Sequence, residues 1–143
     1  MAKNEIPVKV TVKTTIDEAE PMELIVFGSY HKKERAAYLQ YEEVLEEVGT
    51  VRTIVKVSDE EMLILRSGAI KMRLSFRLQE KLRGSYEVPM GAFETATLAQ
   101  KMEYYSDEQG SGEIDLVYDF EMQGNDAGRF HLKILFERDY TRA

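Results

Sequence analysis

Apolar and polar residues alternate strictly along several stretches of this chain. The clearest run is Ile70-Lys71-Met72-Arg73-Leu74-Ser75-Phe76, and the same alternation covers residues 8–12, 113–122 and 129–137. Successive side chains of a β-strand point to opposite faces, so a period of two predicts strands with one dry and one wet face. Such strands favour an antiparallel sheet that closes on itself or stacks on another sheet to cover its apolar side.

Other segments extend the same interpretation. Further strands are expected where Val, Ile, Thr and aromatic residues lie between turn residues, at residues 6–13, 23–27, 50–57, 86–88 and 93–98, with one more short strand at 101–105. About nine or ten strands, with turn signals every 8–12 residues or so and no run of alternating helices, favour a barrel or sandwich over an α/β fold. A closed meander is the economical choice, because closure removes exposed sheet edges.

The stretch from His31 to Val48 does not follow the period of two. Its apolar residues recur at helical spacing among Glu, Lys, Gln and Ala, so the local pattern alone predicts a helix there.

A turn at Ser67-Gly68 would fix the register of the strands on either side. Gly68 accepts a positive φ at little cost, and a two-residue loop there would pair Leu65 with Ile70 and Leu63 with Met72. Both pairs are apolar, so the register is self-consistent. The residues expected to face inward in the whole barrel are Leu63, Leu65, Ile70, Met72, Leu74, Leu116, Tyr118, Leu132 and Ile134.

This register places Arg66 on the outer face beside Lys71 and Arg73. The three cations could form a small patch for an anionic partner, although Arg and Lys stems often simply cover apolar neighbours. A flipped register would bury Arg66 instead, and a buried guanidinium would then need a carboxylate such as Glu42.

Composition narrows the classes of protein. The chain of 143 residues fits one domain, residues 1–143, with a sizeable core. It has no Cys, which excludes disulfides and thiolate chemistry and suits a reducing compartment, so a cytoplasmic protein is expected. Neither a signal-peptide core nor a membrane span can be drawn, and no membrane partner is expected. A net charge of −7 disfavours nucleic acid as a partner.

The order of landmarks resembles the YwiB-like family of uncharacterised bacterial β-barrel proteins. The matching pieces are Gly28, residues 38–43, Arg66-Ser67-Gly68 with the alternating strand after it, residues 86–91 and residues 112–118. The resemblance implies a single antiparallel lipocalin-like β-barrel of about 8–10 strands, similar to lipocalins and fatty-acid-binding proteins. It also implies that residues 37–43 form a strand. The chain has no Trp and so lacks the Gly-X-Trp fingerprint of true lipocalins, and the resemblance transfers a fold without catalytic residues.

No motif in the chain carries catalytic or metal chemistry. His31 and His131 are the only histidines, and the pattern does not bring them together. No nucleophile elbow, phosphate loop or dinucleotide fingerprint occurs, and adjacent acids such as Glu46-Glu47 are usually only surface charge. The sequence therefore predicts a protein that is not an enzyme and has no cofactor.

Two functions remain. The first is a binding protein that holds a small, largely apolar ligand inside the barrel, with Tyr41, Arg66, Tyr86 and Tyr118 as the candidate binding residues. The second is a protein-interaction module or homodimer in which a solid barrel serves as scaffold. A hollow interior favours the first, and a filled interior favours the second.

Overall fold

The chain winds through an antiparallel meander that closes into a barrel. The structure, a computed structural model, describes residues 5–107 and 109–142, and within them all ten strands belong to one closed sheet in which each strand pairs with the next and β1 pairs with β10. The elements are β1 (Ile6–Ile16), β2 (Met22–Lys33), β3 (Ala36–Leu45), β4 (Gly49–Ser58), β5 (Met62–Gly68), β6 (Lys71–Phe76), β7 (Lys81–Val88), β8 (Gly91–Ser106), β9 (Gly112–Met122), β10 (Asn125–Arg138) and the 3₁₀ helix η1 (Tyr140–Arg142).

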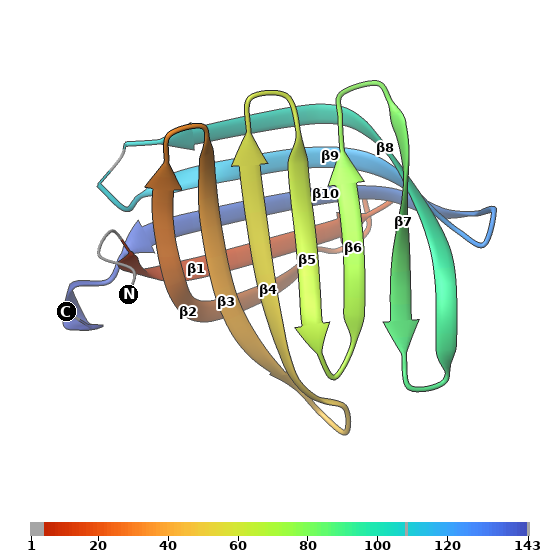
Figure 1. Ribbon diagram of the computed structural model, residues 1–143, viewed down its shortest axis with the longest axis horizontal. Helices are drawn as coiled ribbons and strands as arrows, with labels where there is room; N and C mark the ends of the chain where they lie inside the picture. The colour runs from red at the N-terminus through yellow and green to blue at the C-terminus, as the bar shows by residue number, and fades with distance from the viewer. Residues whose placement is uncertain (1–4, 108, 143) are drawn as a thin grey trace.

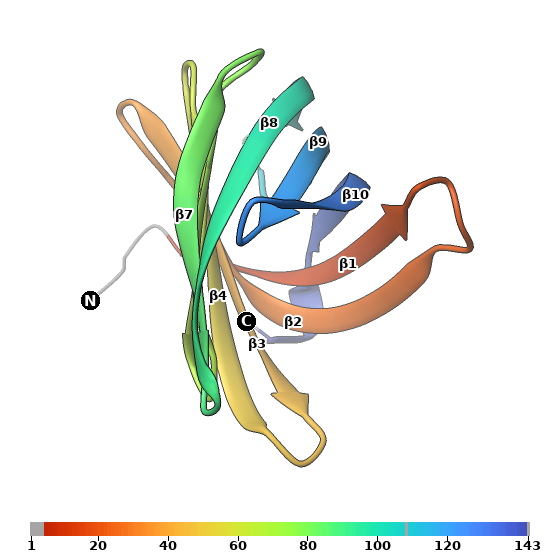
Figure 2. The ribbon, with the colours of Figure 1, turned by 90° about the vertical axis from the view of Figure 1, so that its right-hand side faces the viewer.

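The barrel is flattened into two walls whose strands cross at a steep angle. Strands β3 to β7 form the front wall in Figure 1, and β8, β9, β10 and β1 run across behind them. Figure 2 shows that β2 and β8 bend from one wall to the other and so close the two sides. The antiparallel barrel predicted from the alternation is confirmed.

A β-bulge at Gln100 bends β8, so that the strand belongs to both walls. Before the bulge Thr95, Thr97 and Ala99 face the interior, and after it the inward positions shift to Met102 and Tyr104. A bulge adds one residue to one strand and bends that strand. The segments 93–98 and 101–105, expected as two strands, are therefore one continuous strand.

The stretch 31–48 contains no helix. Residues Ala36–Leu45 form β3, which pairs along its first half with β2 and along its whole length with β4. The strand implied by the resemblance is thus confirmed, and the helix favoured by local spacing is wrong. Pairing on two sides and burial of Ala37, Leu39 and Tyr41 outweigh a helical preference of a few tenths of a kcal/mol per residue or so.

The register predicted for the β5–β6 hairpin is also wrong. Arg66 pairs with Met72 and Ile64 with Leu74, so the turn is centred on Ala69 rather than between Ser67 and Gly68. Met62, Ile64 and Arg66 therefore face inward, whereas Leu63 and Leu65 lie half-buried on the outer face. The other seven residues expected inside the barrel do face inward: Ile70, Met72, Leu74, Leu116, Tyr118, Leu132 and Ile134.

One end of the barrel is filled by side chains. Tyr30 is 2 % exposed, stacks on Phe136 with ring centroids 4.7 Å apart, and shares a hydrogen bond of 2.5 Å between its hydroxyl and that of Tyr104. The Tyr30 hydroxyl also donates to Ser106 Oγ at 3.1 Å. This packed end lies near the turn that joins β8 to β9.

Candidate ligand-binding cavity

A cavity of about 780 Å³ occupies the half of the barrel away from Tyr30. Its mouth lies at the turns that join β3 to β4 and β7 to β8, where Val48, Pro89 and Met90 line the rim. Met90 is 94 % exposed, so the rim presents apolar surface to solvent. The interior is therefore hollow at this end.

The cavity wall is mostly apolar, with aromatic rings at its inner end. Tyr118 and Phe130 line the cavity with their rings stacked at 5.4 Å, and Phe76 packs behind Tyr118 with ring centroids 4.7 Å apart. Aliphatic side chains complete the wall: Val12, Leu24, Val55, Ile64, Ile70, Met72, Leu74, Leu132 and Ile134. Such a surface excludes water and suits hydrocarbon groups.

A row of directly paired residues carries polar groups across this wall. Tyr41 pairs with Thr53, Thr53 with Arg66, Arg66 with Met72, and Met72 with Tyr86. Residues directly opposite each other in a sheet point to the same face, and all five line the cavity. The pairing of β3 to β7 thus places two phenols, a hydroxyl and a guanidinium at one level of the barrel.

Glu43 meets this row from one step nearer the mouth. Its Oε1 accepts a hydrogen bond from Arg66 Nη2 at 2.6 Å, and the two side chains are 14 % and 23 % exposed. The neighbouring Glu42 points outward, where it pairs with Arg52 at 2.9 Å in an exposed ion pair. A flipped register was expected to require a carboxylate for Arg66, and Glu43 supplies it in place of Glu42.

Burial keeps the cavity phenols neutral. Desolvation, reinforced by the nearby Glu43 carboxylate and opposed by Arg66, raises the pKa of Tyr41 to about 12. Desolvation alone raises the pKa of Tyr118 still further above its ordinary value. Both hydroxyls can therefore donate a hydrogen bond at any physiological pH.

Comparison with known proteins places the chain in a family. Residues 6–134 match a domain of unknown function, DUF1934. The chain belongs to the DUF1934 family. It is 33% identical over 138 residues to the uncharacterised β-barrel protein YwiB of Bacillus subtilis, covering 94% of this chain and 96% of YwiB. The crystal structure of the B. subtilis protein superposes with a TM-score of 0.84 at 31% identity, covering 96% of this chain and 94% of that one. The predicted YwiB-like family and barrel fold are confirmed.

The DUF1934 barrel brings together the four residues singled out in the sequence. Tyr41, Arg66, Tyr86 and Tyr118 all line this cavity. Arg66 does not lie with Lys71 and Arg73, which point outward, so the cationic patch of three residues does not form. Glu43 was not among the candidate residues selected from the sequence. Its position two residues after Tyr41 places it on the same strand face and was the available signal.

The histidines lie on the outer surface of the barrel. His31 stacks on Tyr38, its direct partner on β3, with ring centroids 5.0 Å apart. His131 Nε2 donates to Asp115 Oδ1 at 2.7 Å. Among the described residues no three His, Asp or Glu side chains are grouped so that they could hold a metal ion. Nor do those residues include a helix with the length and apolar character to cross a bilayer.

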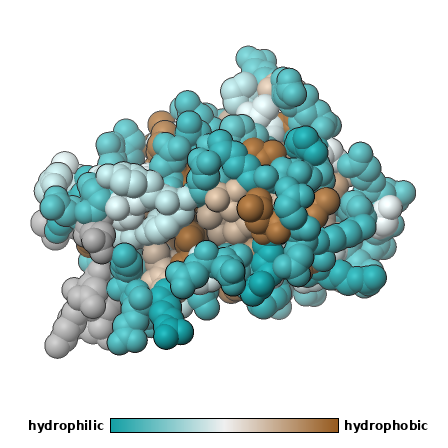
Figure 3. Space-filling view, turned by 90° about the horizontal axis from the view of Figure 1, so that it is seen from above, coloured by the Kyte–Doolittle hydropathy of each residue, from teal (hydrophilic) through white to brown (hydrophobic). Residues whose placement is uncertain are grey.

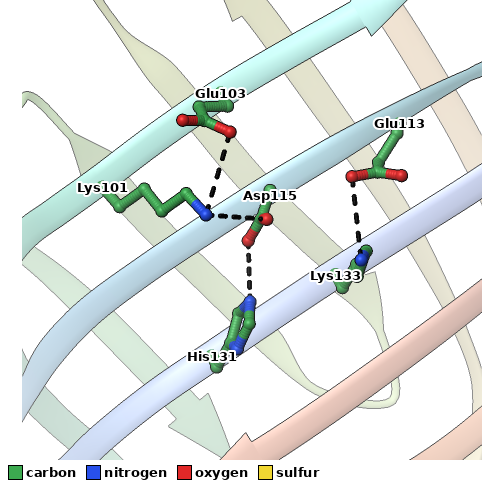
Figure 4. A network of polar contacts seen from close by, with 6 residues as sticks. All are labelled: Lys101, Glu103, Glu113, Asp115, His131 and Lys133. Carbon is green, nitrogen blue, oxygen red and sulfur yellow. Dashed lines mark hydrogen bonds and ion pairs between the residues drawn. The ribbon is translucent and has the colours of Figure 1, made fainter.

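Asp115 is the centre of a polar network on the outer face of β8, β9 and β10 (Figure 4). Lys101 Nζ donates to its Oδ2 at 3.1 Å, and Lys101 also lies 3.8 Å from Glu103. Burial raises the pKa of Asp115, but the hydrogen bonds and positive charges of His131 and Lys101 outweigh burial and hold the pKa below its usual value. This network is structural, because it faces away from the cavity.

The network makes a pH-dependent contribution to stability. Because the pKa of Asp115 is lowered in the folded state, its contribution is complete above the unfolded-state pKa of about 4 and is lost as pH falls through the folded-state pKa. Asp115→Asn is expected to lower the free energy of unfolding by about 1–2 kcal/mol at pH 6. In urea titrations the difference in the free energy of unfolding between variant and wild type should become smaller below about pH 4. Glu103→Gln, at an exposed pair, is the control and should change little. A constant gap down to pH 2 or so would contradict this role.

A second hollow lies at the packed end of the barrel. Its volume is about 650 Å³, and Met62, Met102 and Tyr104 form part of its lining. Its rim carries charges of both signs, namely Lys32, Glu34, Arg35, Asp59, Glu60, Arg77 and Glu80. Mixed charges at the surface are typical of a solvated rim, so the apolar cavity at the other end is the better candidate site.

Proposed function

We propose that this DUF1934 barrel is a non-enzymatic binding protein that holds a small, largely apolar ligand in its cavity. The cavity itself is the observation that carries the proposal. At about 780 Å³ it falls within the range of roughly 300–1,000 Å³ that is usual for small-molecule sites. Its wall also has the usual composition of such sites, since apolar side chains surround a few polar groups held at fixed positions.

The alternative, a solid scaffold for protein interaction or homodimer formation, has less support. A solid scaffold requires a filled interior, whereas the half of the barrel away from Tyr30 holds a cavity of about 780 Å³. On the outer face Ile25 and Phe27 are about half exposed. Single exposed apolar residues are normal on protein surfaces. Figure 3 shows a face that is mainly hydrophilic, with smaller hydrophobic areas between. The hollow interior therefore favours ligand binding.

A neutral phenylnaphthylamine dye provides a direct test. Wild-type protein should enhance the fluorescence saturably. Met72→Trp should weaken binding by about tenfold or more, because Met72 faces the cavity and the larger indole fills it. Arg73→Trp, one residue along and pointing outward, should bind as wild type does.

Native mass spectrometry of freshly purified protein complements the dye. A co-purifying small molecule would support the proposal and identify its class. If the wild-type protein shows no saturable dye binding and carries no small molecule, or if Met72→Trp and Arg73→Trp bind the dye equally, the cavity is not a binding site. A stable dimer without a bound molecule would favour the scaffold instead.

A further inference from the structure

The apolar cavity wall is interrupted at one place by three polar side chains that act together. This polar station consists of Tyr41, Glu43 and Arg66, which all line the cavity. Glu43 and Arg66 are joined at 2.6 Å, and both of their charges act on the Tyr41 hydroxyl, in opposite directions. The station stands between the open mouth and the aromatic inner end, where the polar head of a ligand with a hydrocarbon chain would come to rest.

The polar station has hydrogen-bonding capacity left over. A guanidinium has five N–H donors, and the Glu43–Arg66 contact uses Nη2 of Arg66 and Oε1 of Glu43. The carboxylate retains lone pairs, and the neutral Tyr41 phenol, which contacts the Thr53 hydroxyl, can form one more hydrogen bond. A ligand group that donates one hydrogen bond and accepts another can therefore use both partners at once.

The net charge of the polar station is already balanced. Arg66 supplies one positive charge and Glu43 one negative charge, with little water to screen them. An entering carboxylate would face Glu43 as a like charge and would compete with it for Arg66. An ammonium group would face Arg66 in the same way. A neutral head group is repelled by neither Glu43 nor Arg66.

We infer, resting on the binding function proposed above, that the cavity selects amphiphiles whose head group is neutral and both donates and accepts hydrogen bonds. Primary alcohols and primary amides have this chemistry, and free carboxylic acids in their ionised form do not. The Glu43–Arg66 ion pair sets the preference, because Glu43 already neutralises the positive charge that would attract a carboxylate.

Three ligands with the same hydrocarbon chain test the inference on unmodified protein. Decanol, decanamide and decanoate are titrated at pH 8 as competitors of the neutral phenylnaphthylamine dye. Decanol and decanamide should displace the dye at concentrations about tenfold lower than decanoate, since one well-placed hydrogen bond or one avoided charge repulsion is worth about a factor of ten. Equal or tighter binding of decanoate would overturn the inference and leave the binding function standing. If none of the three displaces the bound dye, the inference is overturned, and the binding function is judged by the dye titration alone.

Matched variants then test the role of Glu43. Glu43→Gln keeps the shape and removes the charge, so decanoate should bind about tenfold more tightly and the preference for decanol and decanamide should disappear. Glu42→Gln, next along β3 but paired outward with Arg52, should leave the ranking unchanged. The double variant Glu43→Gln/Arg66→Gln is neutral and should not gain affinity for decanoate. An unchanged ranking in folded Glu43→Gln would show that the ion pair does not set the preference.

Discussion

Replacing Gly28 by alanine is expected to destabilise the barrel by about 3 kcal/mol or more. A Cβ at Gly28 would lie 1.9 Å from the backbone oxygen of Gln40 and 2.9 Å from Cβ of Tyr41, its direct partner on β3. The nearest obstacle is backbone, which cannot rotate away as a side chain can. The β2–β3 ladder, which joins the two walls, would have to separate at this point.

Gly91→Ala is the matched control for Gly28→Ala. Gly91 lies at the start of β8 with a φ of 159°, and the nearest atom to an added Cβ is 3.9 Å away, so alanine there meets backbone strain without a clash. Gly91→Ala should lower the free energy of unfolding by about 1 kcal/mol, well short of the loss at Gly28. Urea denaturation followed by circular dichroism measures both variants. Equal stability of Gly28→Ala and wild type would mean that β2 and β3 are farther apart here than the structure places them.

The fold was largely predictable because alternation records burial directly. The arms of the β9–β10 hairpin have one apolar and one polar face, so residues 114–122 and 130–136 were assigned correctly as strands from local pattern alone. At residues 31–48 the pattern was ambiguous, because Tyr38 and Val44 are apolar yet point outward, which mimics helical spacing. There the partner strands decide the structure, and they lie outside the local window.

The β5–β6 register shows a different limit. Both faces of β5 are apolar, since Met62 and Ile64 alternate with Leu63 and Leu65, so alternation could not choose between them. The observed turn is set by Gly68, whose φ is 110°, and by the hydrogen bond from Ala69 N to the Thr50 carbonyl on β4. The neighbouring strand β4 thus fixes the register of the β5–β6 hairpin, although the sequence suggests that the turn alone would set it.

The residues of the candidate site could be predicted from their type, but the pairing of Arg66 with Glu43 could not. Tyr41, Arg66, Tyr86 and Tyr118 were selected as groups that could orient an apolar guest, and the barrel places them around one cavity. The pairing of Arg66 with Glu43 depends on β3 and β5 both flanking β4, at a sequence separation of 23 residues. Sequence spacing carries no record of such a diagonal contact across an intervening strand.

Phe76→Ala is expected to cost about 3–5 kcal/mol of stability and to enlarge the cavity at its inner end. Phe76 is 0 % exposed and lies against Tyr118, so truncation removes buried apolar contacts and leaves Tyr118 unsupported on one side. Phe27→Ala is the control of the same chemistry, because Phe27 is 53 % exposed on β2 and should cost about 1 kcal/mol or less.

The two phenylalanine variants also connect stability with binding. If Phe76 forms the inner end of the cavity, its removal should let a longer alcohol such as dodecanol compete better relative to decanol in the dye assay, in the fraction of protein that remains folded. Phe27→Ala should leave that ratio as in wild type. Urea denaturation gives the stability difference. A loss at Phe76 no larger than at Phe27, with no change in chain-length preference, would mean that Phe76 does not support the inner end of the cavity.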